Sequence, residues 1–406
     1  MHATHCRAVK VTGTVLCWWP LLFAIFVAIC ETAQAVPHRP ASADIVLENL
    51  PAGTATLRTL RQNQIAASRG KSVSLDDAML IARRYIELGQ SQSDPRYYGY
   101  AEAALQSWWS QPGPAALRVM RARILQFRHQ FLAALAELEP ALQTDQFNGD
   151  AWLLFAVIEQ VQGNVSAARA ACLKVIPISD PLVGSTCVAS VGAMSGKSEK
   201  SVALLQSALQ QASAADASTR IWAWTTLGEI QVRRGMNNDA ETAFKQALVI
   251  TPDDVYALAA YSDLLLQTQR AAEVMTLLGT HRQADALLLR LAIAAMLSHD
   301  ADAGALRDAL AQRFTEARER GDEAHLREQA RFTLEIDHDA VTALNLAQKN
   351  WKVQHEAADA ELLLAAALAA QQPQAAQPVL DWLKSTGMED ARAAELVKYL
   401  DAGVKP

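Results

Sequence analysis

The chain has 406 residues, of which 51% are hydrophobic, 20% charged and 6% aromatic, and its formal net charge at pH 7 is −6. This weak acidity argues against a nucleic-acid-binding protein, because such proteins need a basic stripe to neutralise phosphates. The length also exceeds what one compact hydrophobic core commonly serves.

The first 35 residues, MHATHCRAVKVTGTVLCWWPLLFAIFVAICETAQA, have the composition of an export signal. Arg7 and Lys10 precede an uncharged run over 11–30, and Ala33-Gln34-Ala35 forms an A-x-A cleavage site. We therefore predict a signal peptide over 1–35 that is cleaved after Ala35, which implies a periplasmic or secreted protein. The uncharged run is also long enough to span a bilayer, so an anchor in the inner membrane formed by residues 11–30 is the alternative.

After the leader, residues 36–406 contain 35 Lys and Arg against 42 Asp and Glu, a net charge of −7, and no apolar run of membrane length. Residues 36–74 are mixed in composition and contain proline, which is typical of a partly ordered segment or a tether. Residues 75–114 then predict a helical hairpin. Its two helices are expected in LDDAMLIARRYIELG and YYGYAEAALQSWW, separated by the turn-forming SQSDP.

The clearest pattern lies in residues 221–254, IWAWTTLGEIQVRRGMNNDAETAFKQALVITPDD. Trp224, Leu227 and Val232 form an apolar stripe at helical spacing, which predicts a helix over 221–234. Gly228 lies on that stripe without a side chain, so a second helix can approach closely. Gly235 is expected to end the first helix, since glycine adopts the left-handed conformation at little cost.

A second helix follows in the same stretch. Asp239 lies at its start, where a carboxylate suits the helix dipole. Ala240, Phe244 and Ala247 form its inner face, and Pro252 is expected to stop it and redirect the chain. Residues 221–254 therefore predict one helix-turn-helix unit.

This unit resembles the tetratricopeptide repeat, a 34-residue helical hairpin with a W-x2-L-G-x2-Y, A-x3-F, A, P pattern. Seven residues match at the expected places, and Gln231 departs where Tyr is usual. The matching residues are Trp224, Leu227, Gly228, Ala240, Phe244, Ala247 and Pro252.

Neighbouring segments keep the period, so we expect repeat units near 115–148, 149–181, 182–220, 221–254 and 255–283. Degenerate hairpins are expected over 284–386, and a capping helix and tail over 387–406. The expected fold is all-α, and the resemblance implies a right-handed superhelical solenoid of helix-turn-helix repeats.

Two cysteines, Cys172 and Cys187, lie outside the leader. Cys172 falls on the second helix of one unit and Cys187 on the first helix of the next, and these helices pack together in this architecture. Because an exported protein meets oxidising conditions, we predict a disulfide between them. The alternative is two buried thiols that fill core positions.

The resemblance also implies that positions 2, 5, 9 and 12 of each unit face a concave groove. A largely apolar wall with scattered acids suits an extended segment or an amphipathic helix of a partner protein, with apolar anchors and a Lys or Arg. The alternative is that Trp222 and Tyr256 only pack against neighbouring helices. The groove residues singled out are Trp222, Thr225, Glu229, Val232, Tyr256, Asp263, Leu266, Leu153 and Val157.

Other motifs predict no chemistry. SVGAMSGKS, residues 190–198, has too few residues between its glycines for a phosphate loop and follows a helix rather than a strand. Asp337-His338-Asp339 and His299 to Asp302 fall in predicted turns and lack metal-ligand spacing. No cofactor, metal site or catalytic set is therefore predicted.

The sequence thus predicts a non-enzymatic, exported scaffold or adaptor for protein–protein interaction in the cell envelope, of a bacterial type. One alternative is an accessory subunit dedicated to one envelope enzyme or transporter. Another is an enzyme whose site lies in residues 284–402, which would need titratable side chains that converge on a cavity.

Overall fold

The computed structural model describes residues 73–92, 94–212, 214–319 and 325–403, all within one compact unit. The predicted leader, the alternative anchor and residues 36–72 lie outside the described residues. Within the described ranges the secondary structure is helical, without a β-strand. None of these helices is long and apolar enough to cross a membrane.

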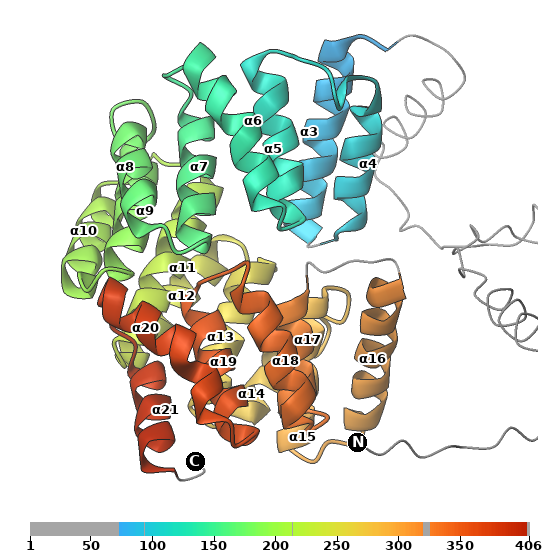
Figure 1. Cartoon of the computed structure of the whole chain (residues 1–406), viewed down its shortest axis with the longest axis vertical. Coiled ribbons are helices and arrows are strands. Elements are labelled where there is room, and N and C mark those ends of the chain that lie inside the picture. The colour runs from blue at the N-terminus through green and yellow to red at the C-terminus, as the bar shows by residue number, and fades with distance from the viewer. Residues whose placement is uncertain (1–72, 93, 213, 320–324, 404–406) are drawn as a thin grey trace, which may run out of the picture. The chain divides into compact units, whose positions relative to one another are not determined.

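Successive helices pack as antiparallel pairs, so the predicted all-α solenoid is confirmed (Figure 1). The first half comprises α3 (Leu75–Gln92), α4 (Arg96–Ala104), the 3-10 helix η1 (Gln106–Trp108), α5 (Ala115–Phe127), α6 (Phe131–Thr144), α7 (Gly149–Val161), α8 (Val165–Val175), α9 (Pro181–Ala193), α10 (Ser198–Gln211), α11 (Ala217–Arg233) and α12 (Asn237–Ile250). The second half comprises α13 (Val255–Gln267), α14 (Ala271–Leu278), α15 (Asp285–Leu297), α16 (Ala303–Glu319), α17 (Leu326–Glu335), α18 (Ala340–Trp351), α19 (Ala357–Ala369), the 3-10 helix η2 (Pro373–Ala376), α20 (Gln377–Thr386) and α21 (Ala391–Ala402).

From α5 onward, the turn inside each helix pair contains one residue in the left-handed conformation. Glycine takes this conformation without a steric penalty, whereas other residues adopt it only when the surrounding structure requires it. Gly235, for example, ends α11 with a φ of 74°, as predicted. In chain order these residues are His129, Gly163, Gly196, Gly235, Gln269, His299, His338 and Gln371.

The helix predicted to begin at residue 221 begins instead at Ala217. Asp216 caps it, because its carboxylate accepts a hydrogen bond of 2.9 Å from the backbone N–H of Thr219. Hydrogen bonds from the Ser218 hydroxyl and from the backbone N–H and hydroxyl of Thr219 lower the pKa of Asp216 to about 2. Residues 217–220, at the end of the predicted unit 182–220, therefore form the first turn of α11.

Close packing of α11 on α12 depends on Gly228. A Cβ atom at this position would lie only 2.4 Å from Cε1 of Phe244. Phe244 is 1% exposed, so its ring fills the space that a side chain at 228 would need. Leu227, Ala240 and Ala247 are buried around it, which agrees with their expected place in the repeat.

A disulfide joins Cys172 on α8 to Cys187 on α9, with 5.5 Å between the Cα atoms. It confirms the predicted bridge between the second helix of one pair and the first helix of the next. Both cysteines lie in a buried cluster with Ala156 and Val191. The bond therefore links two consecutive pairs within the core.

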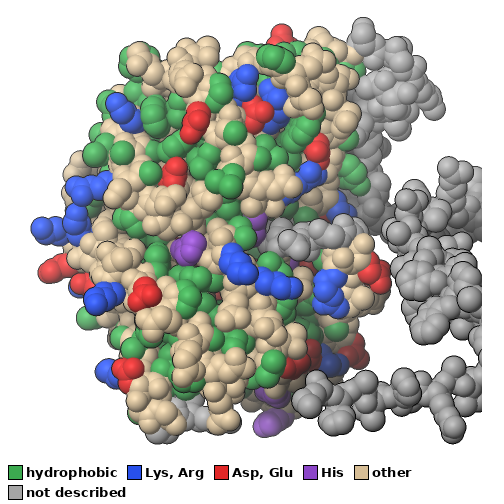
Figure 2. All heavy atoms as spheres, viewed as in Figure 1, with side chains coloured by type: hydrophobic (Ala, Val, Ile, Leu, Met, Phe, Trp, Pro, Cys, Tyr) green, Lys and Arg blue, Asp and Glu red, His purple; other side chains and the backbone are tan. Residues whose placement is uncertain are grey.

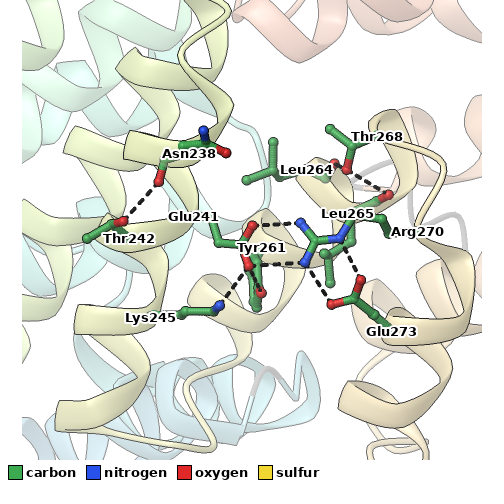
Figure 3. A network of polar contacts seen from close by, with 10 residues as sticks. All are labelled: Asn238, Glu241, Thr242, Lys245, Tyr261, Leu264, Leu265, Thr268, Arg270 and Glu273. Carbon is green, nitrogen blue, oxygen red and sulfur yellow. Dashed lines mark hydrogen bonds and ion pairs between the residues drawn. The ribbon is translucent and has the colours of Figure 1, made fainter.

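A polar network also links consecutive pairs, on α12, α13 and the turn before α14 (Figure 3). Glu241 accepts hydrogen bonds from Arg270 at 2.6 Å and from the Tyr261 hydroxyl at 2.8 Å, and it pairs with Lys245 at 2.7 Å. These donors, Arg270 first, hold the pKa of Glu241 far below its usual value. Since Arg270 also binds Glu273, every charge in the network is paired, so we assign it to structure.

The C-terminal helices return to the turns of earlier pairs. The backbone N–H of His355 donates a hydrogen bond of 2.7 Å to the carbonyl of Val161, at the end of α7. Three turn glycines then lie against this C-terminal region, where an added Cβ atom would meet it at 2.8 to 3.6 Å. The facing pairs are Gly163 with His355, Gly196 with Gly387, and Gly235 with Ala391. The predicted capping helix α21 thus packs on α19 and also contacts α11.

Candidate functional site

The first helices of the pairs adjoin one another on one surface, and polar side chains link them there. We call this surface the first-helix face and define it by α7, α9, α11, α13, α15 and α17. Gln160 on α7 donates a hydrogen bond of 2.8 Å to Ser190 on α9. Further along, Arg290 on α15 bonds Asp263 on α13 at 2.5 Å. The second contact involves Asp263, one of the predicted groove residues.

An ion pair joins two helices that are not neighbours on this face. Arg331 on α17 lies 2.6 Å from Asp263, although α15 stands between their helices in the stack. Such a contact is consistent with the concave groove that the repeat resemblance implies, which stays a prediction. Burial raises the pKa of Asp263, but Arg290 and Arg331 outweigh it and hold that pKa below its usual value. Asp263 is thus an ionised counter-charge for two arginines.

Tyr256 is an exposed aromatic side chain on the first-helix face, and it contacts Glu229. Tyr256 is 60% exposed, and its hydroxyl donates a hydrogen bond of 2.5 Å to the Glu229 carboxylate. Burial raises the pKa of Glu229, and this hydrogen bond only partly offsets the effect. The charge of Glu229 is the first cause that raises the pKa of Tyr256, while Glu356, just before α19, raises it further and Arg327 on α17 lowers it. The exposed ring therefore lies within reach of charges from the C-terminal helices.

Other predicted groove residues are less available. Thr225 is 1% exposed and its hydroxyl donates to the carbonyl of Ile221, so its burial excludes it from the contact surface. Its small side chain bonds back to the preceding turn instead of facing outward. Trp222 is half-buried and packs against the cluster around the disulfide. Val232 and Leu266 are half-buried against the core of the next pairs.

The two predicted positions on α7 lie at the same face. Leu153 is half-buried and packs against the disulfide cluster, and Val157 is half-buried. These side chains make this end of the face apolar, whereas the end near Asp263 is charged.

Sequence reasoning missed the charged residues that the C-terminal helices bring to this region. Arg327 on α17 bonds Asp359 at 2.5 Å and also binds Glu356, which precedes α19. Asp359 accepts a further hydrogen bond of 2.6 Å from Asn350. Burial lowers the pKa of Arg327, but the two carboxylates outweigh it and raise that pKa well above its usual value. Because 284–386 lacks the repeat pattern, no sequence signal placed these residues.

Two carboxyl groups with raised pKa values, Glu361 and Asp390, lie within residues 284–402, where the enzyme alternative would place its site. Burial and the nearby Asp390 raise the pKa of Glu361 on α19. Asp390 is 7% exposed and caps α21 by accepting a hydrogen bond of 2.8 Å from the backbone N–H of Ala393. Its local role is therefore to hold the start of α21 next to α19.

The two turn motifs considered as metal ligands have structural explanations. His299 and His338 occupy left-handed turn positions, where other pairs use glycine. Asp339 caps α18 through a hydrogen bond of 3.1 Å from the backbone N–H of Thr342. In the part of the chain that the structure describes, no three His, Cys, Asp or Glu side chains gather as metal ligands would.

Comparisons with known proteins locate the fold. No family model matches the sequence, and no curated protein matches it. Rap protein, solved in complex with competence and sporulation factor, is similar to this chain with a TM-score of 0.51 and 14% identity, over 86% of this chain and 94% of that one.

Two further solved structures are similar at lower TM-scores. The APC/C hetero-tetramer Cut9–Hcn1 has a TM-score of 0.45 and 15% identity, over 80% of this chain and 63% of that one. PilW, a widely conserved type IV pilus biogenesis factor, has a TM-score of 0.34 and 15% identity, over 70% of this chain and 98% of that one. Together with the repeat pattern of residues 221–254 and the paired helices, the fold makes this chain a tetratricopeptide-like helical repeat protein.

Proposed function

We propose that this protein is a non-enzymatic scaffold of the bacterial cell envelope that binds a segment of a partner protein on its first-helix face. The observation behind the proposal is Tyr256, an aromatic side chain that is 60% exposed on the first-helix face. Aromatic residues on such surfaces are common anchors for partners, because they bury a large area at a low cost in side-chain entropy.

The chemistry around Tyr256 specifies the partner further. Glu229 receives one hydrogen bond, from the Tyr256 hydroxyl, and burial makes its ionised form costly. A Lys or Arg of the partner that approached Glu229 would stabilise the carboxylate and could lie over the Tyr256 ring. Apolar side chains beside it would meet the half-buried Trp222 and Leu266. We therefore expect an extended segment or an amphipathic helix with one basic residue among apolar ones.

The Rap protein structure is a complex, which supports binding as a use of this fold. The envelope location depends on the predicted signal peptide. Accordingly, the partner is expected to be an envelope protein.

In-cell photo-crosslinking would test this proposal. A photo-reactive phenylalanine analogue replaces Tyr256 in one strain and Val249 in a second strain. Val249 is 76% exposed on α12, a second helix, and serves as the matched control. We expect one dominant envelope protein to crosslink from position 256 and not from 249. Glu229→Lys should abolish this crosslink by placing a positive charge against the partner's basic residue. Equal crosslinks from both positions, or none from 256, would contradict the proposal.

A further inference from the structure

A small pocket opens between α8, α9 and α10, away from the first-helix face. Its volume is about 110 Å³. Since one water occupies roughly 30 Å³ in the liquid, the pocket has room for a group of only a few heavy atoms. Pockets for drug-sized ligands are several times larger. The lining residues are Arg169, Val188, Gly192, Ser195, Lys197, Lys200, Ser201 and Leu204.

Three basic side chains line this pocket, against one acid, Glu199, in the first turn of α10. Arg169, Lys197 and Lys200 make no ion pair with an acid among the described residues, although most arginines elsewhere in those ranges are paired. Figure 2 shows Lys and Arg side chains along the left edge of the molecule, where α10 lies. In a chain with a net charge of −6, this local excess of positive charge favours an anion.

The first turn of α10 also favours an anion. The residue before this helix is Lys197, whose side chain provides no cap. The first backbone N–H groups of a helix lack partners within the helix, and the helix dipole places partial positive charge there. A helix start of this kind binds anions when it is open to the outside.

Ser201 provides independent evidence for a ligand. It is 3% exposed, and its hydroxyl makes no hydrogen bond within the described residues. That hydroxyl is directed at Gly192, because a Cβ atom added to Gly192 would lie 2.7 Å from Ser201 Oγ. Gly192 and Ser201 both line the pocket, so an unsatisfied donor faces it. The hydroxyl of Ser198, in the same turn, is also buried and lacks a partner.

We propose that this pocket binds a phosphate group, presented either by a small organic phosphate or by a phospholipid headgroup. Three cations, a helix start and a free hydroxyl suit a group with several anionic oxygens better than a single carboxylate. Val188 and Leu204 form apolar walls for the carbon atoms next to the phosphate. Leu173 on α8, 54% exposed, adds apolar surface that a lipid could cover.

This site is not a nucleotide-binding phosphate loop, because the segment 190–198 lacks the loop spacing and follows a helix instead of a strand. The inference is also independent of the first-helix face, so either proposal can fail alone.

Calorimetric titration with glycerol 3-phosphate, at an ionic strength held constant with chloride, tests the soluble source. The protein is used as purified from cells. We expect a dissociation constant on the order of 1 mM, typical of a small group in a shallow site. Lys197→Gln with Lys200→Gln should weaken binding at least about tenfold, since each removes a charge at the phosphate. Lys349→Gln with Lys352→Gln, on α18 and just after it, removes the same charge elsewhere and should leave binding unchanged.

Co-sedimentation with phosphatidylglycerol vesicles, compared with phosphatidylcholine vesicles, tests the lipid source. Binding to either probe that Lys197→Gln with Lys200→Gln weakens at least about tenfold, and that Ser201→Ala also weakens, supports the proposal and identifies the source. Ser201→Ala keeps the charge, so its effect separates the hydroxyl from general electrostatics. Binding to neither probe, or equal binding by the Lys197→Gln, Lys200→Gln variant and its α18 control, would overturn the proposal.

Discussion

Gly228→Ala should destabilise the protein, against the usual effect of replacing a helical glycine. The new Cβ atom would lie 2.4 Å from one atom of the Phe244 ring and within 2.8 Å of two others. Contacts between carbon atoms are normally about 3.5–4.0 Å, so the ring or the helices must shift by roughly 1 Å. Overpacking of this kind costs about 1–3 kcal/mol, whereas the higher helix propensity of alanine returns at most about 1 kcal/mol. We expect a net loss of about 1–2 kcal/mol.

Urea unfolding followed by far-ultraviolet circular dichroism measures this loss. Gly99→Ala is the matched control, because Gly99 lies within α4 and a Cβ atom there would meet nothing within 4 Å. The control should gain up to about 1 kcal/mol from helix propensity alone. Phe244→Leu should be destabilising alone, but it should cost less in the Gly228→Ala background, since it removes the clash. If Gly228→Ala stabilises the protein as much as Gly99→Ala does, our account of the α11–α12 contact is wrong.

Three further predictions concern the disulfide, a buried acid and the first-helix face. Replacing Cys172 and Cys187 by Ala should lower the free energy of unfolding by about 3 kcal/mol, because the bond closes a 15-residue separation; an unchanged urea midpoint would contradict this. Glu361→Gln should stabilise the protein more at pH 8 than at pH 5. Burial and the neighbouring acid raise the folded-state pKa of Glu361 above its usual value of 4.5, so the parent protein loses stability as pH rises above that value. An equal effect in denaturation at both pH values would refute the assignment. Asp263→Asn should lower the free energy of unfolding by about 2–3 kcal/mol, since two arginines lose their counter-charge. The loss should be smaller than for a fully buried pair, because these side chains are partly exposed. An unchanged thermal unfolding temperature would show that the ion pairs are dispensable.

The sequence predicted those parts of the fold that depend on contacts close in the chain. Trp224, Gly228 and Phe244 identified a helix pair because each contacts a residue within the same unit, and the bridge between Cys172 and Cys187 joins adjacent pairs. The predicted start of α11 was wrong because the helix begins after its capping residue, Asp216, and not at the start of the repeat unit. The division of 115–283 into five repeat units stays a prediction, although the helices that it requires are present.

The candidate site was less predictable, because its residues come from segments far apart in the sequence. Repeat positions predicted Asp263 and Tyr256 on the face formed by the first helices, and in the structure these residues bond Arg290 and Glu229 of that face. They could not indicate the Arg331 partner of Asp263, 68 positions away, since α17 has lost the repeat pattern. The prediction for Thr225 was wrong because a repeat position does not take account of side-chain length. The short side chain of Thr225 is buried and donates to the carbonyl of Ile221.

The return of the C-terminal helices explains why the turn glycines have a double requirement. Gly163 and Gly196 need the left-handed conformation to end a helix, and they also need an absent side chain because the C-terminal segment lies against them. His129 occupies the equivalent turn one pair earlier, where its ring stacks on Phe131 and lies 3.4 Å from Gln354. At this turn the C-terminal segment meets the His129 ring, so a side chain is tolerated here. Glu356, just before α19, and Asp359 on α19 both bind Arg327. Glu356 and Arg327 also act on the pKa of Tyr256. The position of α19 therefore affects both the contacts at the turns and the charges near Tyr256. A partner that displaced Arg327 would thus weaken the packing of α17 on α19 as well as occupy the face.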